Sequence, residues 1–384
     1  MIDESTMFKL KKFETHPFVS VIMPIRNEAD FIESSMAAIL AQDYPPDRME
    51  ILIIDGMSDD TTRALCARII DDNPHRSIRL LDNPGRIVPK AMNIAFPQTT
   101  GDIIVRIDGH CEIAPDYVSR CVEHLGKGDV VGVGGPIETI STSEAGEAIA
   151  VAMSSKFGVG GSAFRTVKDR SILADTIPFP AYTRQAMEYA GPYDEEMLRN
   201  QDDEYNYRLR SLGYKIRLTP DVRSVYYSRA SIRKLWWQYC QYGMYKVRVM
   251  QKHPQQMRPR HFVPPLLVTI LIGGLVLAPL HTALMLLWLL AIALYAGANL
   301  LASFLTARRS KLKQPQWLPV AFATLHFGYG LGFLAGLLKF RRYWGAPGEL
   351  ETARLRWPQP IPRPQPETEE WQPIAGEERV AVGD

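Results

Sequence analysis

Residues 18–28, which read FVSVIMPIRNE, carry the pattern that decides the fold. A short run of apolar and β-branched residues, typical of a buried strand, ends in a polar cluster, and 29–42 then places apolar residues at helical spacing. The same order of strand and helix returns at 50–72 and 79–96, and a fourth strand is expected at 102–108. Strands that alternate with helices of this length predict an α/β fold with a mostly parallel sheet.

The composition limits the class of protein. The 384 residues include 44 Lys and Arg against 42 Asp and Glu, a formal net charge of +2 that argues against a general nucleic-acid binder. With 46% hydrophobic and 22% charged residues, the chain is globular rather than disordered. The four cysteines form no CxxC pair, which favours a reducing compartment. Residues 1–16 contain no apolar core typical of a secretory signal, so we expect the N-terminal half in the cytoplasm.

The second half of the chain indicates a membrane. Residues 222–260 contain nine Lys and Arg, several aromatic residues and no acidic residue, a pattern that suits an anionic membrane surface. The 44 residues 262–305 are uncharged and would form roughly 66 Å of helix, twice a bilayer core of about 30 Å, so we predict two spanning helices there. A third candidate, 318–338, has Gly332 and Gly336 at the spacing that favours close helix packing.

Basic residues predict the orientation. Arg258 and Arg260 precede the first span and a basic loop at 308–313 follows the second, so both ends are expected on the cytoplasmic side. The third segment ends at the basic 339–342, which a simple third crossing would place outside, so it either violates this rule or re-enters the membrane. The predicted organisation is an N-terminal extension at 1–16, an α/β domain at 17–230, a basic amphipathic interface helix at 231–260, a transmembrane region at 261–344 with spans at about 262–280, 283–305 and 318–338, and a disordered, Pro-rich acidic tail at 345–384.

Two polar clusters follow the first two predicted strands. They are Pro24-Ile25-Arg26-Asn27-Glu28 and Asp55-Gly56-Met57-Ser58-Asp59-Asp60. Each alone is typical of a turn or a helix cap. Together they place carboxylates and amides at the edge of the sheet where ligands bind, and they suit ribose hydroxyls and a uracil-like base edge.

A third cluster, Asp108-Gly109-His110-Cys111-Glu112, follows the fourth strand. In extended backbone alternate side chains share a face, so we expect Asp108, His110 and Glu112 to reach one ion, with Cys111 packed in the core. A carboxylate and imidazole set favours Mn²⁺ over Mg²⁺. Such an ion would hold a diphosphate and neutralise its charge as it leaves. The alternative is a turn with a surface histidine.

These clusters in this order, with the stretch Gly85…Lys90…Asn93, resemble the nucleotide-sugar half of family 2 glycosyltransferases with the Rossmann-like GT-A fold. Residues 201–210 (QDDEYNYRLR) resemble the helix that carries the family's acidic pair and arginine. The resemblance covers about 18–250 and looks closest to the bacterial succinoglycan-biosynthesis glucosyltransferase subgroup. It implies transfer of a hexose, most simply glucose from UDP-glucose, to a polyprenyl-diphosphate-linked saccharide at the bacterial inner membrane, with the catalytic domain cytoplasmic.

The resemblance also assigns roles. Matching Arg208 to the family's arginine makes Asp202 the catalytic base, with a helix cap as its alternative role, and puts Gln201 where the family has Glu; His110 replaces a carboxylate. The implied nucleotide-sugar-binding residues are Pro24, Arg26, Asn27, Glu28, Asp55, Ser58, Asp59, Lys90, Asn93 and Asp108. The implied residues on the acceptor or phosphate side are Gln201, Arg208, Arg233 and Lys234.

The reaction expected from these residues is a direct displacement. A sugar hydroxyl needs a carboxylate to accept its proton, and one base without a matched carboxylate nucleophile suits inversion. The sequence has no Gln-x-x-Arg-Trp motif of processive synthases, which favours one sugar per encounter. Two alternatives stay open: a polyprenyl-phosphate glycosyltransferase, and a catalytically inactive membrane adaptor whose tail binds partners such as other polysaccharide-assembly proteins.

Overall fold

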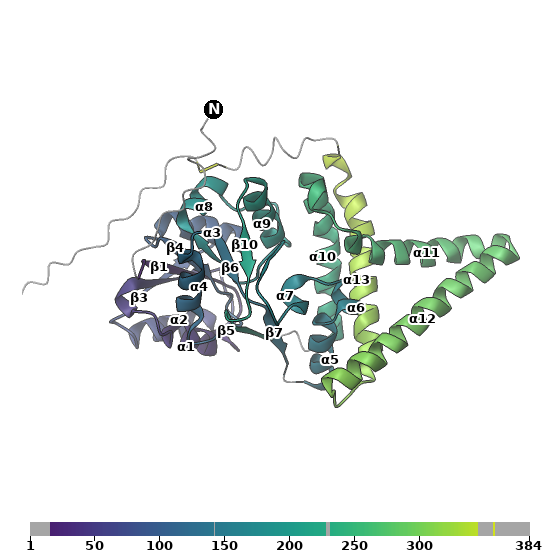
Figure 1. Ribbon diagram of the computed structural model, residues 1–384, viewed down its shortest axis with the longest axis horizontal. Coiled ribbons are helices and arrows are strands. Elements are labelled where there is room, and N and C mark those ends of the chain that lie inside the picture. The colour runs from purple at the N-terminus through teal and green to yellow at the C-terminus, as the bar shows by residue number, and fades with distance from the viewer. Residues whose placement is uncertain (1–15, 142, 228–230, 345–355, 358–384) are drawn as a thin grey trace, which may run out of the picture.

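Four parallel strands form one half of the large sheet in the computed structural model, which describes residues 16–141, 143–227, 231–344 and 356–357 (Figure 1). The strands β1 (Val19–Ile25), β2 (Met49–Asp55), β3 (Ser77–Asp82) and β4 (Ile103–Arg106) follow the order β3-β2-β1-β4. All residues of β1 and β2 are buried, because the intervening helices cover both faces of the sheet. These helices are α1 (Ile32–Leu40), α2 (Thr62–Asp71) and α3 (Val88–Ala95). The predicted βαβ pattern is confirmed.

The other half of the sheet is mixed. Strand β9 (Ala181–Thr183) runs antiparallel between β4 and β6 (Gly132–Gly134), and β10 (Ile216–Leu218) and β8 (Ile172–Leu173) complete the sheet. A second sheet of three strands has the order β5-β11-β7, from β5 (Cys111–Ile113), β11 (Ser224–Tyr227) and β7 (Ile137–Ile140). The remaining helices of this domain are α4 (Tyr117–Gly126), α5 (Glu144–Met153), α6 (Lys156–Val159), α7 (Ala163–Thr166), α8 (Arg184–Ala190) and α9 (Gln201–Ser211). Two apolar clusters pack on opposite faces of the large sheet, since alternate β1 residues such as Val21 and Ile22 belong to different clusters.

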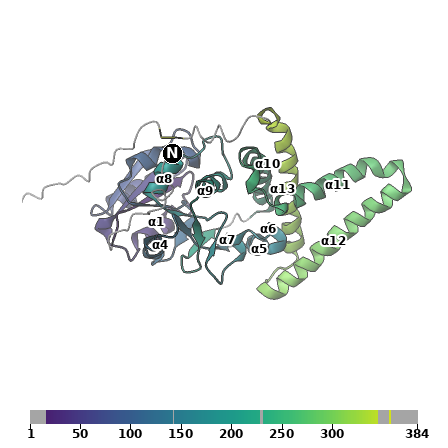
Figure 2. The same ribbon diagram turned by 45° about the horizontal axis from the view of Figure 1, so that its top comes forward.

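Helices α10 (Ile232–Lys252) and α13 (Trp317–Lys339) lie side by side along one flank of the domain (Figures 1 and 2). They run parallel and approach closely through glycines, because a Cβ on Gly332 would lie 2.0 Å from the Cys240 carbonyl oxygen and one on Gly336 would lie 2.6 Å from that of Met244. The close packing predicted from the glycine spacing is therefore found. Its partner is the basic helix α10.

The charges of α10 only partly fit the expected membrane-facing role. Lys246, Arg248 and Lys252 are buried and form ion pairs with Asp203, Glu196 and Asp194 of the α/β domain. The expectation that the basic residues of 231–260 face lipid headgroups is wrong for these three, because carboxylates distant in the sequence neutralise them. Arg233 and Lys234 at the start of the helix are exposed.

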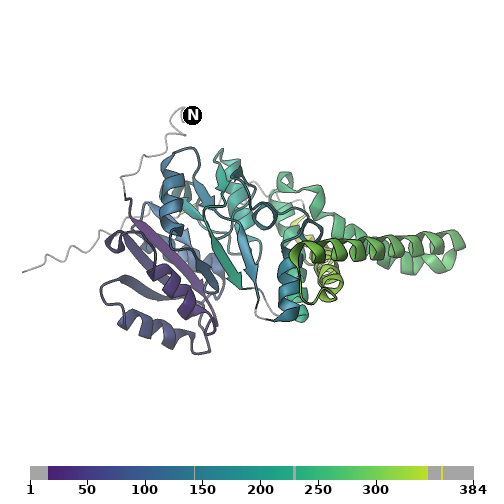
Figure 3. The ribbon, with the colours of Figure 1, turned by 60° about the horizontal axis from the view of Figure 1, so that its bottom comes forward.

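Helices α11 (Val263–Leu277) and α12 (Thr282–Ser310) form a hairpin that projects away from the rest of the protein (Figures 1 and 3). The turn falls at Ala278–Leu280, at the boundary between the predicted spans 262–280 and 283–305, and His281 Nδ1 accepts a hydrogen bond from the Ala283 backbone amide at the start of α12. Most large apolar side chains of the hairpin are exposed. Three helices, Pro259–Leu280, Thr282–Ser310 and Trp317–Lys339, are long and apolar enough to cross a membrane, so the protein associates with membranes.

The third of these segments is one uninterrupted helix, so the sequence 318–338 does not form a re-entrant loop. Short 3₁₀ turns occur at Pro46–Arg48, Phe96–Gln98, Pro254–Gln256, Pro259–His261, Ala278–Leu280 and Arg341–Tyr343. From the tail at 345–384 only two residues are described, and Trp357 of these packs its ring 5.2 Å from that of Phe96. The disorder predicted for the tail and most of the extension at 1–16 lie outside the described residues.

The glycine contact between α10 and α13 predicts a stability difference between two matched variants. Gly332→Ala places a methyl group against a backbone oxygen, so we expect a loss of about 1–3 kcal/mol and a lower Tm of the full chain in detergent. Gly297→Ala on α12 meets open space and gains helix propensity, so its Tm should be equal to or above that of the parent. Equal Tm values for the two variants would contradict the close contact.

Candidate active site

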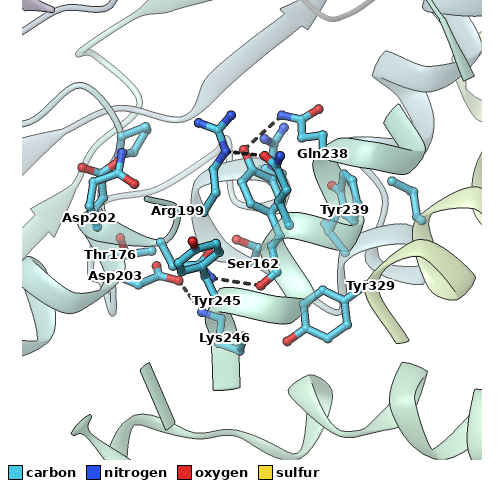
Figure 4. A pocket seen from close by; sticks show the side chains of 18 of the residues that line it. Ser162, Thr176, Arg199, Asp202, Asp203, Gln238, Tyr239, Tyr245, Lys246 and Tyr329 are labelled. Carbon is cyan, nitrogen blue, oxygen red and sulfur yellow. Dashed lines mark hydrogen bonds and ion pairs between the residues drawn. The ribbon is translucent and has the colours of Figure 1, made fainter. Parts of the chain in front are cut away.

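A cavity of about 1580 Å³ lies at the carboxyl ends of β1 and β4 and extends to the apolar helices. The strand order reverses between β1 and β4, and ligands of open α/β sheets bind at such a switch point. Figure 4 shows Asp202 and Tyr239 on opposite sides of the cavity. The sheet side is lined by Pro24, Arg26, Glu28, Asp108 and His110, α9 contributes Gln201, Asp202 and Asp203, and the far end is lined by residues of α10 to α13, among them Tyr239, Leu267, Leu294 and Tyr329.

Arg106, the last residue of β4, joins two of the predicted site residues. Its side chain is only 4% exposed. Its Nε and Nη2 atoms donate to Asp108 Oδ1 over 3.0 and 2.8 Å, and its Nη1 donates to Asp202. One guanidinium therefore holds carboxylates 94 positions apart in one site. Arg106 was missed because it belongs to the predicted strand 102–108 and not to a polar cluster after a strand; a charged residue within a buried strand was the available signal.

The environment of Asp202 suits a general base. Burial raises the pKa of Asp202 to about 6, although the Arg106 guanidinium lowers it, and the carboxylates of Asp108 and Asp203 add to the rise. A carboxylate with this pKa is ionised at neutral pH and accepts a proton more readily than an ordinary aspartate.

The two residues after Asp202 anchor α9. Asp203 pairs with Lys246 of α10. Glu204 is buried; it accepts a hydrogen bond from Arg208 Nη2 over 2.6 Å and lies beside His253. Although burial raises the pKa of Glu204, these two partners lower it to about 2. Arg208 also donates to the Ala190 and Pro192 carbonyls. The expectation that Arg208 serves the phosphate side is wrong, because this buried side chain fixes α9 and does not line the cavity.

The turn after β4 differs from the expected extended strand. Asp108 and His110 lie in this turn, since β4 ends at Arg106, and both line the cavity. Glu112 lies in β5 of the second sheet, where its Oε1 accepts from the Tyr227 hydroxyl over 2.8 Å. The expectation that Glu112 shares an ion with the other two is therefore wrong, and no group of three such side chains is placed to hold a metal in the part of the chain that the structure describes. Cys111 is buried, as expected.

His110 has the setting of an oriented ligand. Its Nδ1 lies 2.9 Å from Glu28 Oε1, and both residues line the cavity. A carboxylate that accepts Nδ1–H fixes the tautomer and the orientation of an imidazole. Asp108 and His110 therefore form a set of one carboxylate and one imidazole that suits a divalent ion whose other positions are filled by phosphate oxygens and water.

Asn27 joins the two loops that carry the first and second clusters. Its backbone amide donates to Ser58 Oγ over 2.9 Å, and its side-chain Nδ2 donates to Asp59 Oδ1 over 2.7 Å. Ser58 Oγ in turn donates to Asp55, whose other oxygen pairs with Arg63. These predicted residues come together as a network behind Pro24, Arg26 and Glu28, and do not themselves line the cavity.

Three further predicted residues are not brought to the cavity wall. Lys90 pairs with Glu195 over 3.7 Å, and Asn93 donates to the same side chain and to the Tyr193 carbonyl. Arg233 is exposed on α10, whereas its neighbour Lys234 lines the cavity.

Arg165 of α7 is a candidate that no motif signalled. The residue is 8% exposed and lines the cavity, and its Nη1 has no hydrogen-bond partner among the described residues. Lys156 and Arg260 line the cavity as well. A buried guanidinium with an unused donor, such as that of Arg165, favours an anionic ligand.

Comparisons with known proteins identify relatives of this chain. Residues 20–188 match the model for Glycosyl transferase family 2. Succinoglycan biosynthesis protein ExoA of Rhizobium meliloti (strain 1021) is 31% identical over 324 residues, 84% of this chain and 96% of that protein. A dolichyl N-acetyl-alpha-D-glucosaminyl phosphate 3-beta-D-2,3-diacetamido-2,3-dideoxy-beta-D-glucuronosyltransferase of Methanococcus voltae is 27% identical, covering 84% of this chain and 98% of that one.

The fold is also that of a solved glycosyltransferase. The mannosyltransferase PcManGT of Pyrobaculum calidifontis, in complex with GDP-Man and Mn²⁺, superposes with a TM-score of 0.54 at 22% identity, covering 83% of this chain and 87% of that one. The chain belongs to glycosyltransferase family 2 and is a glycosyltransferase with a GT-A-type domain, as the resemblance predicted.

Asp202→Asn should lower kcat about 10²- to 10⁴-fold while nucleotide binding persists, because the amide cannot accept a proton. In the parent the rate should rise with pH through about 6 and then level off, since the base acts only when ionised. Asp129→Asn, an exposed acid in the same domain, is the control and should keep full activity. A rate independent of pH in this window, or an active Asn variant, would contradict the role of Asp202.

Proposed function

We propose that the protein transfers a hexose, with glucose from UDP-glucose as the first candidate, to a polyprenyl-diphosphate-linked saccharide, with inversion and one sugar per encounter. The observation that carries this proposal is that one continuous cavity runs from Asp108 at the sheet to Leu267 and Leu294 on the exposed apolar hairpin. A polar donor and a lipid-bound acceptor can meet only in a site that reaches both environments. The names of the two relatives, one in succinoglycan biosynthesis and one acting on a dolichyl phosphate sugar, support the acceptor class.

The donor half of the site is assigned to the loops after β1, β2 and β4. Asp108 and His110 would hold a divalent cation, more readily Mn²⁺ than Mg²⁺ because one ligand is an imidazole. When bound, the cation supplies positive charge that stabilises the departing diphosphate. Glu28 orients His110, and Arg106 keeps the Asp108 carboxylate in place.

Asp202 accepts the proton of the acceptor hydroxyl as that oxygen attacks the anomeric carbon. The buried guanidinium of Arg106 fixes the Asp202 carboxylate and balances its charge through the ion pair. Since one carboxylate serves as the base and the attack is direct, the configuration of the transferred sugar is inverted.

The acceptor half is assigned to the wall formed by α7 and the membrane-side helices. Arg165 and Lys234 would face the acceptor diphosphate, with Lys156 and Arg260 on the same wall. The apolar residues beyond them suit the first isoprene units. The location proposed is the bacterial inner membrane, with the α/β domain in the cytoplasm, where nucleotide sugars are made.

The donor site is tested by UDP binding to the full chain in detergent. We expect binding in the presence of Mn²⁺, weaker binding with EDTA, and a loss of the Mn²⁺-dependent part in Asp108→Ala. Binding that is equal with Mn²⁺, with EDTA and in the variant would contradict the cation site. Binding of another nucleotide in place of UDP would correct the donor.

The acceptor site is tested with Arg165→Gln. We expect the KM for a polyprenyl-diphosphate-linked saccharide to rise about 10- to 100-fold, because a charged hydrogen bond of about 1.5–3 kcal/mol is lost, while UDP binding stays unchanged. Arg223→Gln, an exposed arginine of the same domain, is the control and should leave both unchanged. Turnover with the bare polyprenyl phosphate instead would favour the alternative acceptor, and an unchanged KM would remove Arg165 from the site.

A further inference from the structure

Helix α13 has the length and hydropathy of a membrane span but different surroundings from those of α11 and α12. Half of its most apolar window is buried inside the protein, against 17% and 6% for the windows of the two hairpin helices. A helix surrounded by lipid exposes most of its surface, as the hairpin does. The neighbours that cover α13 therefore decide whether it can lie in a bilayer.

The C-terminal half of α13 is covered by α10. A Cβ on Gly328 would lie 3.2 Å from the Trp236 carbonyl oxygen, and the contacts continue through Gly332 and Gly336 to a hydrogen bond of 2.9 Å from Gln251 Nε2 to the Phe340 carbonyl. The two helices thus run together over about 12 residues of α13, from Gly328 to Phe340.

The N-terminal half of α13 is covered by the α/β domain. His326 Nε2 lies 2.8 Å from the Phe157 carbonyl oxygen, and the Phe157 ring packs edge-on against Phe322 with 5.0 Å between centroids. Both halves of α13 therefore contact parts of the chain that precede the hairpin, α5 and α6 at the N-terminal half and α10 at the C-terminal half. A helix that crosses a bilayer can touch a domain outside the membrane only near one end.

The charges on α10 exclude a shared crossing. Lys246, Arg248 and Lys252 lie beside the C-terminal half of α13 and are paired with acids of the α/β domain. Arg233 and Lys234 are exposed at the start of α10, near the level of the middle of α13. If α13 crossed the hydrocarbon, these cations and their acidic partners would enter it, which is highly unfavourable.

We propose that α13 lies along the cytoplasmic surface of the membrane, and that only α11 and α12 cross it. The hairpin starts against the middle of α13, where a Cβ on Gly330 would lie 2.7 Å from the Pro264 carbonyl oxygen. It returns to the start of α13, where Asn299 donates to the Pro319 carbonyl over 3.0 Å. In Figures 1, 2 and 3 the hairpin leaves α13 on the side opposite the large sheet. An α13 that faces the bilayer would rest on it through its exposed apolar residues, which include Trp317, Val320 and Leu338.

This arrangement removes the conflict in the distribution of basic residues. Both flanks of α13 are basic, at 308–313 and 339–342, and both lie on the cytoplasmic side when α13 does not cross. Trp357, beyond α13, packs against Phe96 of the α/β domain and so lies on that same side. The inference rests on the membrane contact alone and is independent of the proposed donor and acceptor.

The test is labelling of single cysteines in full-length protein in native membranes. Cys66, Cys111 and Cys121 are buried, so Cys240→Ser gives a suitable background. In it, Lys313→Cys, Arg342→Cys and His281→Cys report the start of α13, its end and the hairpin tip. A membrane-impermeant maleimide is added to inside-out and to right-side-out vesicles, and labelling in detergent confirms that each thiol is reactive.

We expect Lys313→Cys and Arg342→Cys to be labelled only in inside-out vesicles, and His281→Cys only in right-side-out vesicles. Labelling of Arg342→Cys only in right-side-out vesicles would show a third crossing and overturn the proposal. Labelling of Arg342→Cys in detergent but in neither kind of vesicle would place it within the bilayer and would overturn the proposal as well. Labelling of His281→Cys in inside-out vesicles would show that the hairpin does not cross.

Discussion

Three consecutive carboxylates at the start of α9 connect the parts of this protein. Asp202 pairs with Arg106 at the end of β4, Asp203 pairs with Lys246 of α10, and Glu204 pairs with Arg208 and His253. A buried charge is strongly destabilising once its partner is removed. The sheet, the site and the membrane-side helices therefore depend on the position of α9 for their mutual arrangement.

These ion pairs also place the chemistry close to the apolar helices. Lys246 brings α10 against α9, and the glycines of α13 bring that helix against α10, so one cavity has walls from both the sheet and the hairpin. Arg106 adds the link on the sheet side, since it holds Asp108 and Asp202 together. The distance between the donor end of the cavity and the lipid-facing end is thus set by charge pairing and close helix contact.

The features that the sequence predicted correctly depend on local patterns. The strands from β1 to β4 were predictable because runs such as 18–25 are buried on both faces, and the hairpin was predictable because 262–305 carries no charge. The features that it mispredicted depend on partners far along the chain. The basic residues of α10 were expected at the membrane surface, and only folding brings Asp203 to Lys246. Arg208 was expected on the phosphate side, but in the fold it also binds the distant Ala190 and Pro192 carbonyls, and Glu112 turns away because β4 ends at Arg106.

The sequence by itself determined the α/β class, the family, the clusters at the strand ends and the presence of long apolar helices. These features depend on periodicity and short motifs, which are visible in neighbouring residues without any knowledge of tertiary contacts. The tertiary structure decided which residues meet. It alone shows Arg106 between Asp108 and Asp202, Arg165 at the cavity wall and α13 held along α10. The physical reason is that a buried charge or a close glycine contact is defined by its partner, and partners such as Asp202 for Arg106 and Cys240 for Gly332 lie tens of residues away in the chain.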